Sequence, residues 1–169
     1  MKVRRALVVG GLVMGLIVPA ACGGQEAQRV GGATIPSASE DAFRVGEAVK
    51  LGDAQLTIHG FKDPFTSDRV QATAAEGSRY VTIDAEVKNL ANEPRPVSAF
   101  AQFELRDADG KKFEPSSVNA NLPALGGPTP PGGSQRGAGI FEVPNGSTQL
   151  TVVFNNLLYG SGTAEVFLG

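Results

Sequence analysis

The sequence has few of the side chains that bind transition metals. Its 169 residues include one histidine, one cysteine and two methionines. Both methionines, Met1 and Met14, lie in an N-terminal segment that we expect to be removed, which leaves His59 and Cys22. Copper sites need clustered His, Met or Cys ligands. The sequence therefore argues against copper binding, and we expect no cofactor.

A surplus of basic residues is also missing. The chain has 15 basic and 17 acidic residues, a formal charge of −2. Without Lys2, Arg4 and Arg5 of the N-terminal segment, 12 basic residues face 17 acidic ones, a charge of −5. Proteins that bind nucleic acid use a basic stripe to displace counterions from phosphate. We therefore expect no nucleic-acid partner.

The apolar run at the N-terminus is too short to span a bilayer comfortably. It covers 6–18, after the basic stretch 1–5 and before Pro19, Ala20 and Ala21. A transmembrane helix needs about 20 apolar residues, whereas a basic start, a short apolar run and small residues form a secretory signal peptide. Residues 1–21 are therefore predicted to be a signal peptide. A buried core helix is the alternative.

The end of this segment resembles a bacterial lipobox. Ala20, Ala21 and Cys22 fit that motif, whereas Pro19 stands where it usually has an apolar residue. The resemblance implies that Cys22 becomes the first residue and carries acyl chains, and two such chains give stable membrane attachment. The protein is then anchored to the outer face of the cell membrane. The alternative is cleavage near Ala21 and secretion in soluble form.

Residues 22–42 are predicted to be a flexible tether. The stretch is rich in Gly, Ala, Ser and polar residues and has neither helical nor strand periodicity. About 20 residues of such a chain span roughly 25 Å, enough to hold a domain clear of lipid headgroups. An additional edge strand is the alternative for this stretch.

Residues 43–169 are predicted to form one all-β domain. In its clearest strand, Val81, Ile83, Ala85 and Val87 alternate with polar residues that would face water, Thr82, Asp84, Glu86 and Lys88. No stretch keeps helical spacing for long, and 116–121 is expected to form at most one or two helical turns. Strand-like runs cover 43–51, 54–62, 79–89, 97–106, 136–143, 148–154 and 163–168. About seven to eight short strands predict an antiparallel sandwich of two sheets.

No pattern of catalytic residues is present. A Ser-His-Asp triad would have to use His59, which is expected on the solvent face of its strand. The sequence also lacks a Gly-x-Ser-x-Gly turn before a helix. We therefore expect that the protein is not an enzyme.

Weak calcium binding is the one metal function left open. Asp107, Asp109 and Glu104 lie near one turn and carry carboxylate oxygens. A calcium-binding EF-hand loop needs a Glu at its twelfth position, and counting from Asp107 that position is Val118. A hairpin turn is therefore the favoured interpretation, with Gly110 able to adopt a positive φ.

The connection 114–134 is the candidate functional loop. It is longer than most connections, and such loops often bind partners or are disordered. The residues expected to dock on a partner are Leu122, Leu125, Pro128, Pro130 and Pro131. The favoured alternative is a crossover that covers the end of the sandwich.

Several stretches resemble the telokin-like domain of unknown function of exported Gram-positive lipoproteins. The stretches are 80–89 (YVTIDAEVKN), 103–115 (FELRDADGKKFEP), 130–134 (PPGGS) and 139–144 (GIFEVP). That family is related in fold to a secreted immunogenic antigen with an immunoglobulin-like sandwich. The resemblance implies an immunoglobulin-like β-sandwich that acts as an extracytoplasmic binding module, and it carries no catalytic residues over to this chain.

The sequence therefore predicts a lipid-anchored, non-catalytic interaction module. Its partners would be the membrane, through the lipid on Cys22, and a protein of the cell envelope. The alternative is a secreted soluble antigen or a carrier of a small apolar ligand.

Overall fold

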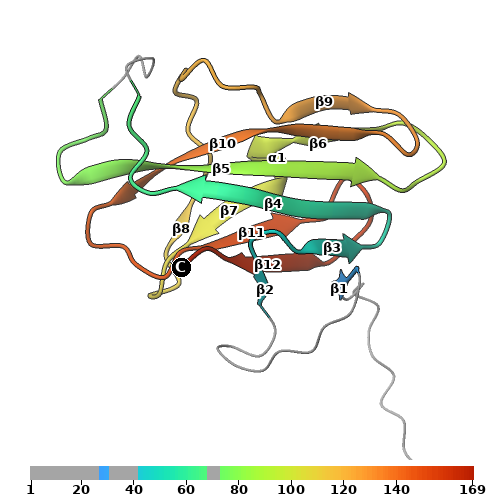
Figure 1. Ribbon diagram of the computed structural model, residues 1–169, viewed down its shortest axis with the longest axis horizontal. Helices are drawn as coiled ribbons and strands as arrows, with labels where there is room; N and C mark the ends of the chain where they lie inside the picture. The colour runs from blue at the N-terminus through green and yellow to red at the C-terminus, as the bar shows by residue number, and fades with distance from the viewer. Residues whose placement is uncertain (1–26, 31–41, 68–72) are drawn as a thin grey trace, which may run out of the picture.

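The structure is a computed structural model that describes residues 27–30, 42–67 and 73–169 (Figure 1). Cys22, the signal peptide and most of the predicted tether lie outside the described residues. The described residues form one short helix, α1 (Ala99–Gln102), and twelve strands: β1 (Gln28–Arg29), β2 (Phe43–Arg44), β3 (Ala48–Leu51), β4 (Ala54–Lys62), β5 (Ser78–Asn89), β6 (Arg95–Ser98), β7 (Phe103–Arg106), β8 (Lys112–Phe113), β9 (Gly126–Thr129), β10 (Ser134–Pro144), β11 (Thr151–Asn155) and β12 (Thr163–Phe167).

The strands build a β-sandwich, as the sequence predicted. The first sheet has the order β1-β3-β4-β5-β10, and the second has the order β2-β12-β11-β7-β8. A small third sheet pairs β6 with β9 at one corner of the sandwich (Figure 1). All pairs are antiparallel except β2 and β12, which run parallel.

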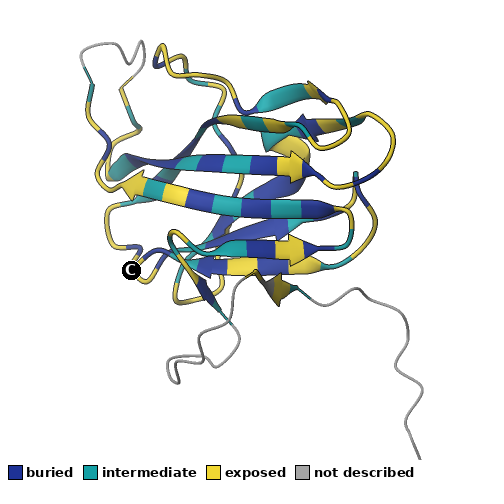
Figure 2. Cartoon of the chain, turned by 45° about the vertical axis from the view of Figure 1, so that its right-hand side comes forward, coloured by how far each residue is buried: buried dark blue, intermediate teal, exposed yellow. Residues whose placement is uncertain are grey.

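The core lies between the inner faces of the two sheets. Val81, Ile83, Ala85 and Val87 of β5 are at most 1% exposed, so the period-two prediction for this strand is confirmed. The second sheet contributes alternate residues of β7, β11 and β12, and the rings of Phe103 and Phe154 pack 5.2 Å apart. Figure 2 shows the resulting alternation of buried and more exposed residues along the strands.

The predicted continuous strand over 97–106 is wrong, because α1 interrupts it. Ser98 caps the helix: its hydroxyl accepts a hydrogen bond from the Ala101 amide at 3.3 Å. Gln102 reaches back and accepts from the Ser98 amide at 3.0 Å. The helical turn rotates the side chains, so Gln102 is buried and Phe100 is 61% exposed.

Other segments also differ from the prediction of seven to eight strands. The run 43–51 is split into β2 and β3 at Gly46, whose φ is +89°. Residues 116–121 form no helix, and β9 lies inside the predicted long connection. Within the predicted tether, Gln28 and Arg29 pair with β3 as an edge strand.

In the part of the chain that the structure describes, no helix has the length and apolar character needed to cross a membrane.

A groove on the outer face of the first sheet

The outer face of the first sheet is covered at one end by a second apolar cluster. Phe65, Tyr80, Ala120 and Ile140 are its buried members, and all lie outside the main core. Tyr80 and Ile140 belong to the sheet, whereas Phe65 and Ala120 come from loops. Burial raises the pKa of the Tyr80 phenol, and the nearby Glu142 carboxylate adds to the effect. This end of the outer face is therefore a small core of its own.

Residues 115–125, here called the strap, run along β10 and hold the second apolar cluster in place. Pro115 bridges to Phe141, Ala124 bridges to Ala138, and the Ala138 amide donates to the Pro123 carbonyl at 2.8 Å. The strap approaches β10 so closely that a Cβ atom on Gly137 would lie 2.5 Å from the backbone of Ala124. The strap thus occupies the open edge of β10.

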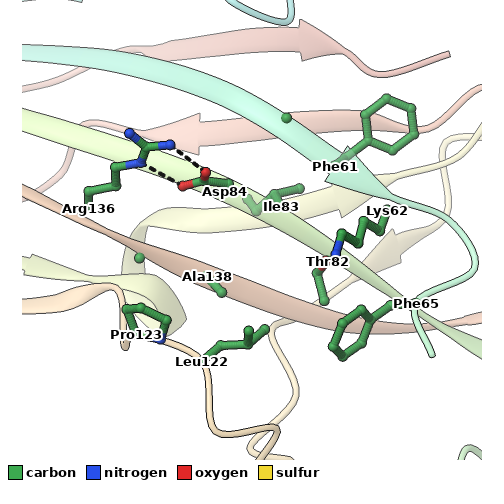
Figure 3. A pocket seen from close by; sticks show the side chains of 12 residues that line it. Phe61, Lys62, Phe65, Thr82, Ile83, Asp84, Leu122, Pro123, Arg136 and Ala138 are labelled. Atoms are coloured by element: carbon green, nitrogen blue, oxygen red, sulfur yellow. Dashed lines mark hydrogen bonds and ion pairs between the residues drawn. The ribbon is translucent and has the colours of Figure 1, made fainter. Parts of the chain in front are cut away.

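A groove of about 520 Å³ lies between the strap and the outer faces of β4, β5 and β10 (Figure 3). Its lining is mostly apolar or small: Gly60, Phe61, Phe65, Thr82, Ile83, Leu122, Pro123, Gly137 and Ala138. Thr82 is only 6% exposed, although its position predicted that it would face water. Leu122, on the wall formed by the strap, remains 41% exposed. Pockets of this volume accept small ligands.

Three charged residues line the same groove: Lys62, Asp84 and Arg136. Arg136 and Asp84 form a double hydrogen bond of 2.9 and 2.7 Å across β10 and β5. The bond from Arg136 holds the pKa of the Asp84 carboxyl below its usual value of 3.8. Among the described residues, Lys62 makes no ion pair. The charged lining residues therefore carry one net positive charge, which resides on Lys62.

His59 lies on the outer face, as predicted, but not in a triad. Its Nε2 atom is 2.9 Å from the Glu86 carboxylate. Two hydrogen bonds hold the pKa of Glu86 below its usual value; the one from Ser134 has the larger effect and the one from His59 the smaller. In a catalytic triad the histidine lies between the serine and the carboxylate, because it must take the serine proton. Here the Glu86 carboxylate lies between Ser134 and His59, so His59 is not placed to take the Ser134 proton.

The turn around Asp107 is a hairpin turn. One oxygen of Asp107 accepts from the amides of Asp109 and Lys111, and the other accepts from the Ser147 hydroxyl. Glu104 binds Arg106 and Lys112 instead of turning towards Asp107. Within residues 27–30, 42–67 and 73–169, no three His, Cys, Asp or Glu side chains come together as a metal site.

The residues expected to dock on a partner do not form one surface in the structure. Leu122 forms one wall of the groove. Leu125 is 4% exposed and packs in the main core, so its prediction as a surface contact is wrong. Pro128 lies exposed in β9, and Pro130 and Pro131 lie exposed in the connection to β10, away from the groove lining.

The groove could hardly be predicted from the sequence. Its lining comes from β4, β5, β10, the strap and the loop that follows β4, and no local pattern connects these segments. The available signal is the pair of small residues Gly137 and Ala138 in β10, since small residues in a strand leave space for another segment to approach.

This architecture also occurs in other solved proteins. The yjhA protein from Bacillus subtilis superposes with a TM-score of 0.57 at 16% identity, over 75% of this chain and 99% of that one. The ycdA protein from Bacillus subtilis subsp. subtilis str. 168, described as a candidate lipoprotein, has a TM-score of 0.54 at 22% identity. That match covers 70% of this chain and 38% of the other. At these identities the likeness shows the fold.

In sequence, the chain is 26% identical over 86 residues to the uncharacterized protein YxkC of Bacillus subtilis (strain 168). The match covers 50% of this chain and 47% of YxkC, so this chain matches about half the length of that relative. Residues 43–165 match the family described as Domain of unknown function (DUF4352), and the chain therefore belongs to the DUF4352 family.

Proposed function

We propose that the protein is a non-catalytic binding module, held at the outer face of the cell membrane by a lipid on Cys22, and that the groove is its ligand-binding surface. The groove carries the binding part of the proposal. It combines about 520 Å³ of space, apolar walls and one unpaired cation, and no base-activated nucleophile is found among its lining residues. The anchoring part rests on the signal-like segment and on the small residues before Cys22.

Metabolic labelling with a radioactive fatty acid tests the anchor. The unchanged chain should carry label, whereas Cys22→Ala should carry none. A chain with Cys22→Ala and Gln25→Cys is the matched control for unspecific acylation, because it keeps one cysteine three residues away. Label on either variant contradicts anchoring at Cys22.

Pro19 favours a second candidate, a secreted form of the same binding module. Replacement by the more usual apolar residue, Pro19→Leu, should then increase the labelled fraction. If the unchanged chain is unlabelled and found in the medium, the secreted form is correct.

A photoactivatable cross-linker placed at Leu122 on intact cells tests the groove. We expect an adduct that is lost when Ala138→Trp fills the groove. The same cross-linker at Leu157, which is 57% exposed and outside the groove lining, is the control. Identical adducts at both positions would exclude the groove as the binding surface.

A further inference from the structure

We infer that the groove takes a small amphipathic anion, with an apolar body and a single carboxylate head. This inference rests on the proposed role of the groove as the ligand-binding surface, and it names the chemical class of the ligand. Three features of the described residues support this inference. They are the shape of the groove, the position of its unpaired charge and the edge of β10 beside the groove, which the strap occupies.

The shape favours an apolar body of narrow cross-section. Gly60, Gly137 and Ala138 place little or no side chain above the sheet, and Phe65 and Leu122 lie beside this floor (Figure 3). At Gly60 even a Cβ atom would meet nothing within 4 Å, so the floor is open there. An alkyl or aromatic body that lies across this floor would contact apolar atoms of Phe65 and Leu122 and would thereby be removed from water.

The charge favours one negative group on the ligand. Arg136 is already neutralised by Asp84, and the nearby Asp63 carboxylate is bound to Arg79. Lys62 therefore faces no compensating carboxylate in the described structure. Figure 3 shows its side chain reaching towards Thr82, its partner on β5, at the border of the apolar floor. A carboxylate at this point would pair with Lys62 while the body extends towards Leu122.

The closed edge argues against an extended peptide as the ligand. A peptide that adds to a sheet needs free amide and carbonyl groups on an edge strand. Beside the groove these groups of β10 are taken by the strap, through the Ala138 amide and the bridge to Ala124. The few polar groups in the lining also argue against a sugar, which would require many hydrogen-bond partners.

Calorimetric titration of the full chain with decanoate, decan-1-ol and decyltrimethylammonium tests the inference, because the three probes share one body and differ in charge. Decanoate should bind most tightly. Octanoate should bind roughly fifteenfold more weakly than decanoate, because it is two methylene groups shorter and each methylene group removed from water contributes about fourfold. Equal affinities for decanoate and decan-1-ol, or a preference for the cation, would overturn the assignment.

Variants locate the head and the body. Lys62→Gln should weaken decanoate about two- to fivefold and leave decan-1-ol unchanged. Lys88→Gln, on the outer face of β5 but outside the groove lining, is its control. Ala138→Trp should weaken both probes at least about tenfold. Leu122→Asp, with Leu157→Asp as control, gives an independent test if Ala138→Trp does not fold.

Decanoate affinity that persists in both Ala138→Trp and Leu122→Asp places the ligand elsewhere and overturns the inference. Its failure can be separated from failure of the proposed function. A chain that is labelled at Cys22 and cross-linked through Leu122, but does not bind decanoate, retains the proposed function and loses this ligand class.

Discussion

Asn89 shows how one residue can organise the end of a strand. Its side-chain amide donates to the carbonyls of Glu93 and Thr129 at 2.8 and 3.0 Å, and its oxygen accepts from the Ala91 amide. It is fully buried, so these bonds replace water for three backbone groups. The terminal Asn of the stretch 80–89 therefore links β5, the following loop and β9.

Asp84 gives a pH-dependent prediction at the same scale. The pKa of its carboxyl is lowered in the folded protein by the hydrogen bond from Arg136, so the ion pair favours folding above the usual carboxyl pKa of 3.8. This stabilisation is lost as the pH falls through the lowered pKa. Asp84→Asn should therefore reduce the melting temperature near neutral pH, and the difference should shrink as the pH falls below 3.8.

Thermal unfolding followed by circular dichroism across this pH range measures the effect. In an Arg136→Gln background, Asp84→Asn should lose most of its pH-dependent effect, because the partner that lowers the pKa is gone. A pH dependence that is unchanged in that background would contradict the assignment to Arg136.

At the scale of elements, most strands were predictable and their partners were not. The period-two runs for β4, β5, β10 and β12 were confirmed because alternate residues of each strand face one continuous core. α1 was not predicted because the helix-start signature places Glu or Gln three residues after a Ser cap, whereas Gln102 lies four residues after Ser98. β9 was missed because Gly126, Gly127 and Pro128 have low strand propensity, and its pairing with β6 is not visible locally.

The contact between the strap and β10 gives a prediction for an element. Gly137→Ala places a methyl group where the strap backbone lies, so either the strap or β10 must move. We expect a loss of about 1–3 kcal/mol in the free energy of unfolding, measured in urea. Gly60→Ala in the same sheet is the matched control, because its methyl group meets nothing within 4 Å. Equal losses for both variants would mean that the strap is not in close contact with β10.

At the scale of the whole molecule, Arg79 connects segments that are distant in the sequence. Its guanidinium binds the Asp63 carboxylate and donates to the carbonyls of Pro144 and Ser147. It thereby ties the loop that follows β4 to the turn after β10. The hydrogen bond with Asp63 raises the pKa of Arg79 further, so the charge persists at any ordinary pH.

Arg79→Met should lower the free energy of unfolding by roughly 2–3 kcal/mol, because it leaves a carboxylate and two carbonyls without their donor. Chemical denaturation measures the loss. Lys50→Met is the control, since Lys50 is exposed and makes no ion pair in the described ranges. Comparable losses in both variants would show that the contacts of Arg79 contribute little to the free energy of unfolding.

The strap has one more consequence for the whole molecule. In the two large sheets, three outer strands, β1, β2 and β8, have two residues each, and the fourth, β10, is covered by the strap. An uncovered, long outer strand is a template on which a neighbouring chain can polymerise. This domain offers no such template along β10, so many copies can be concentrated side by side without joining their sheets into fibrils.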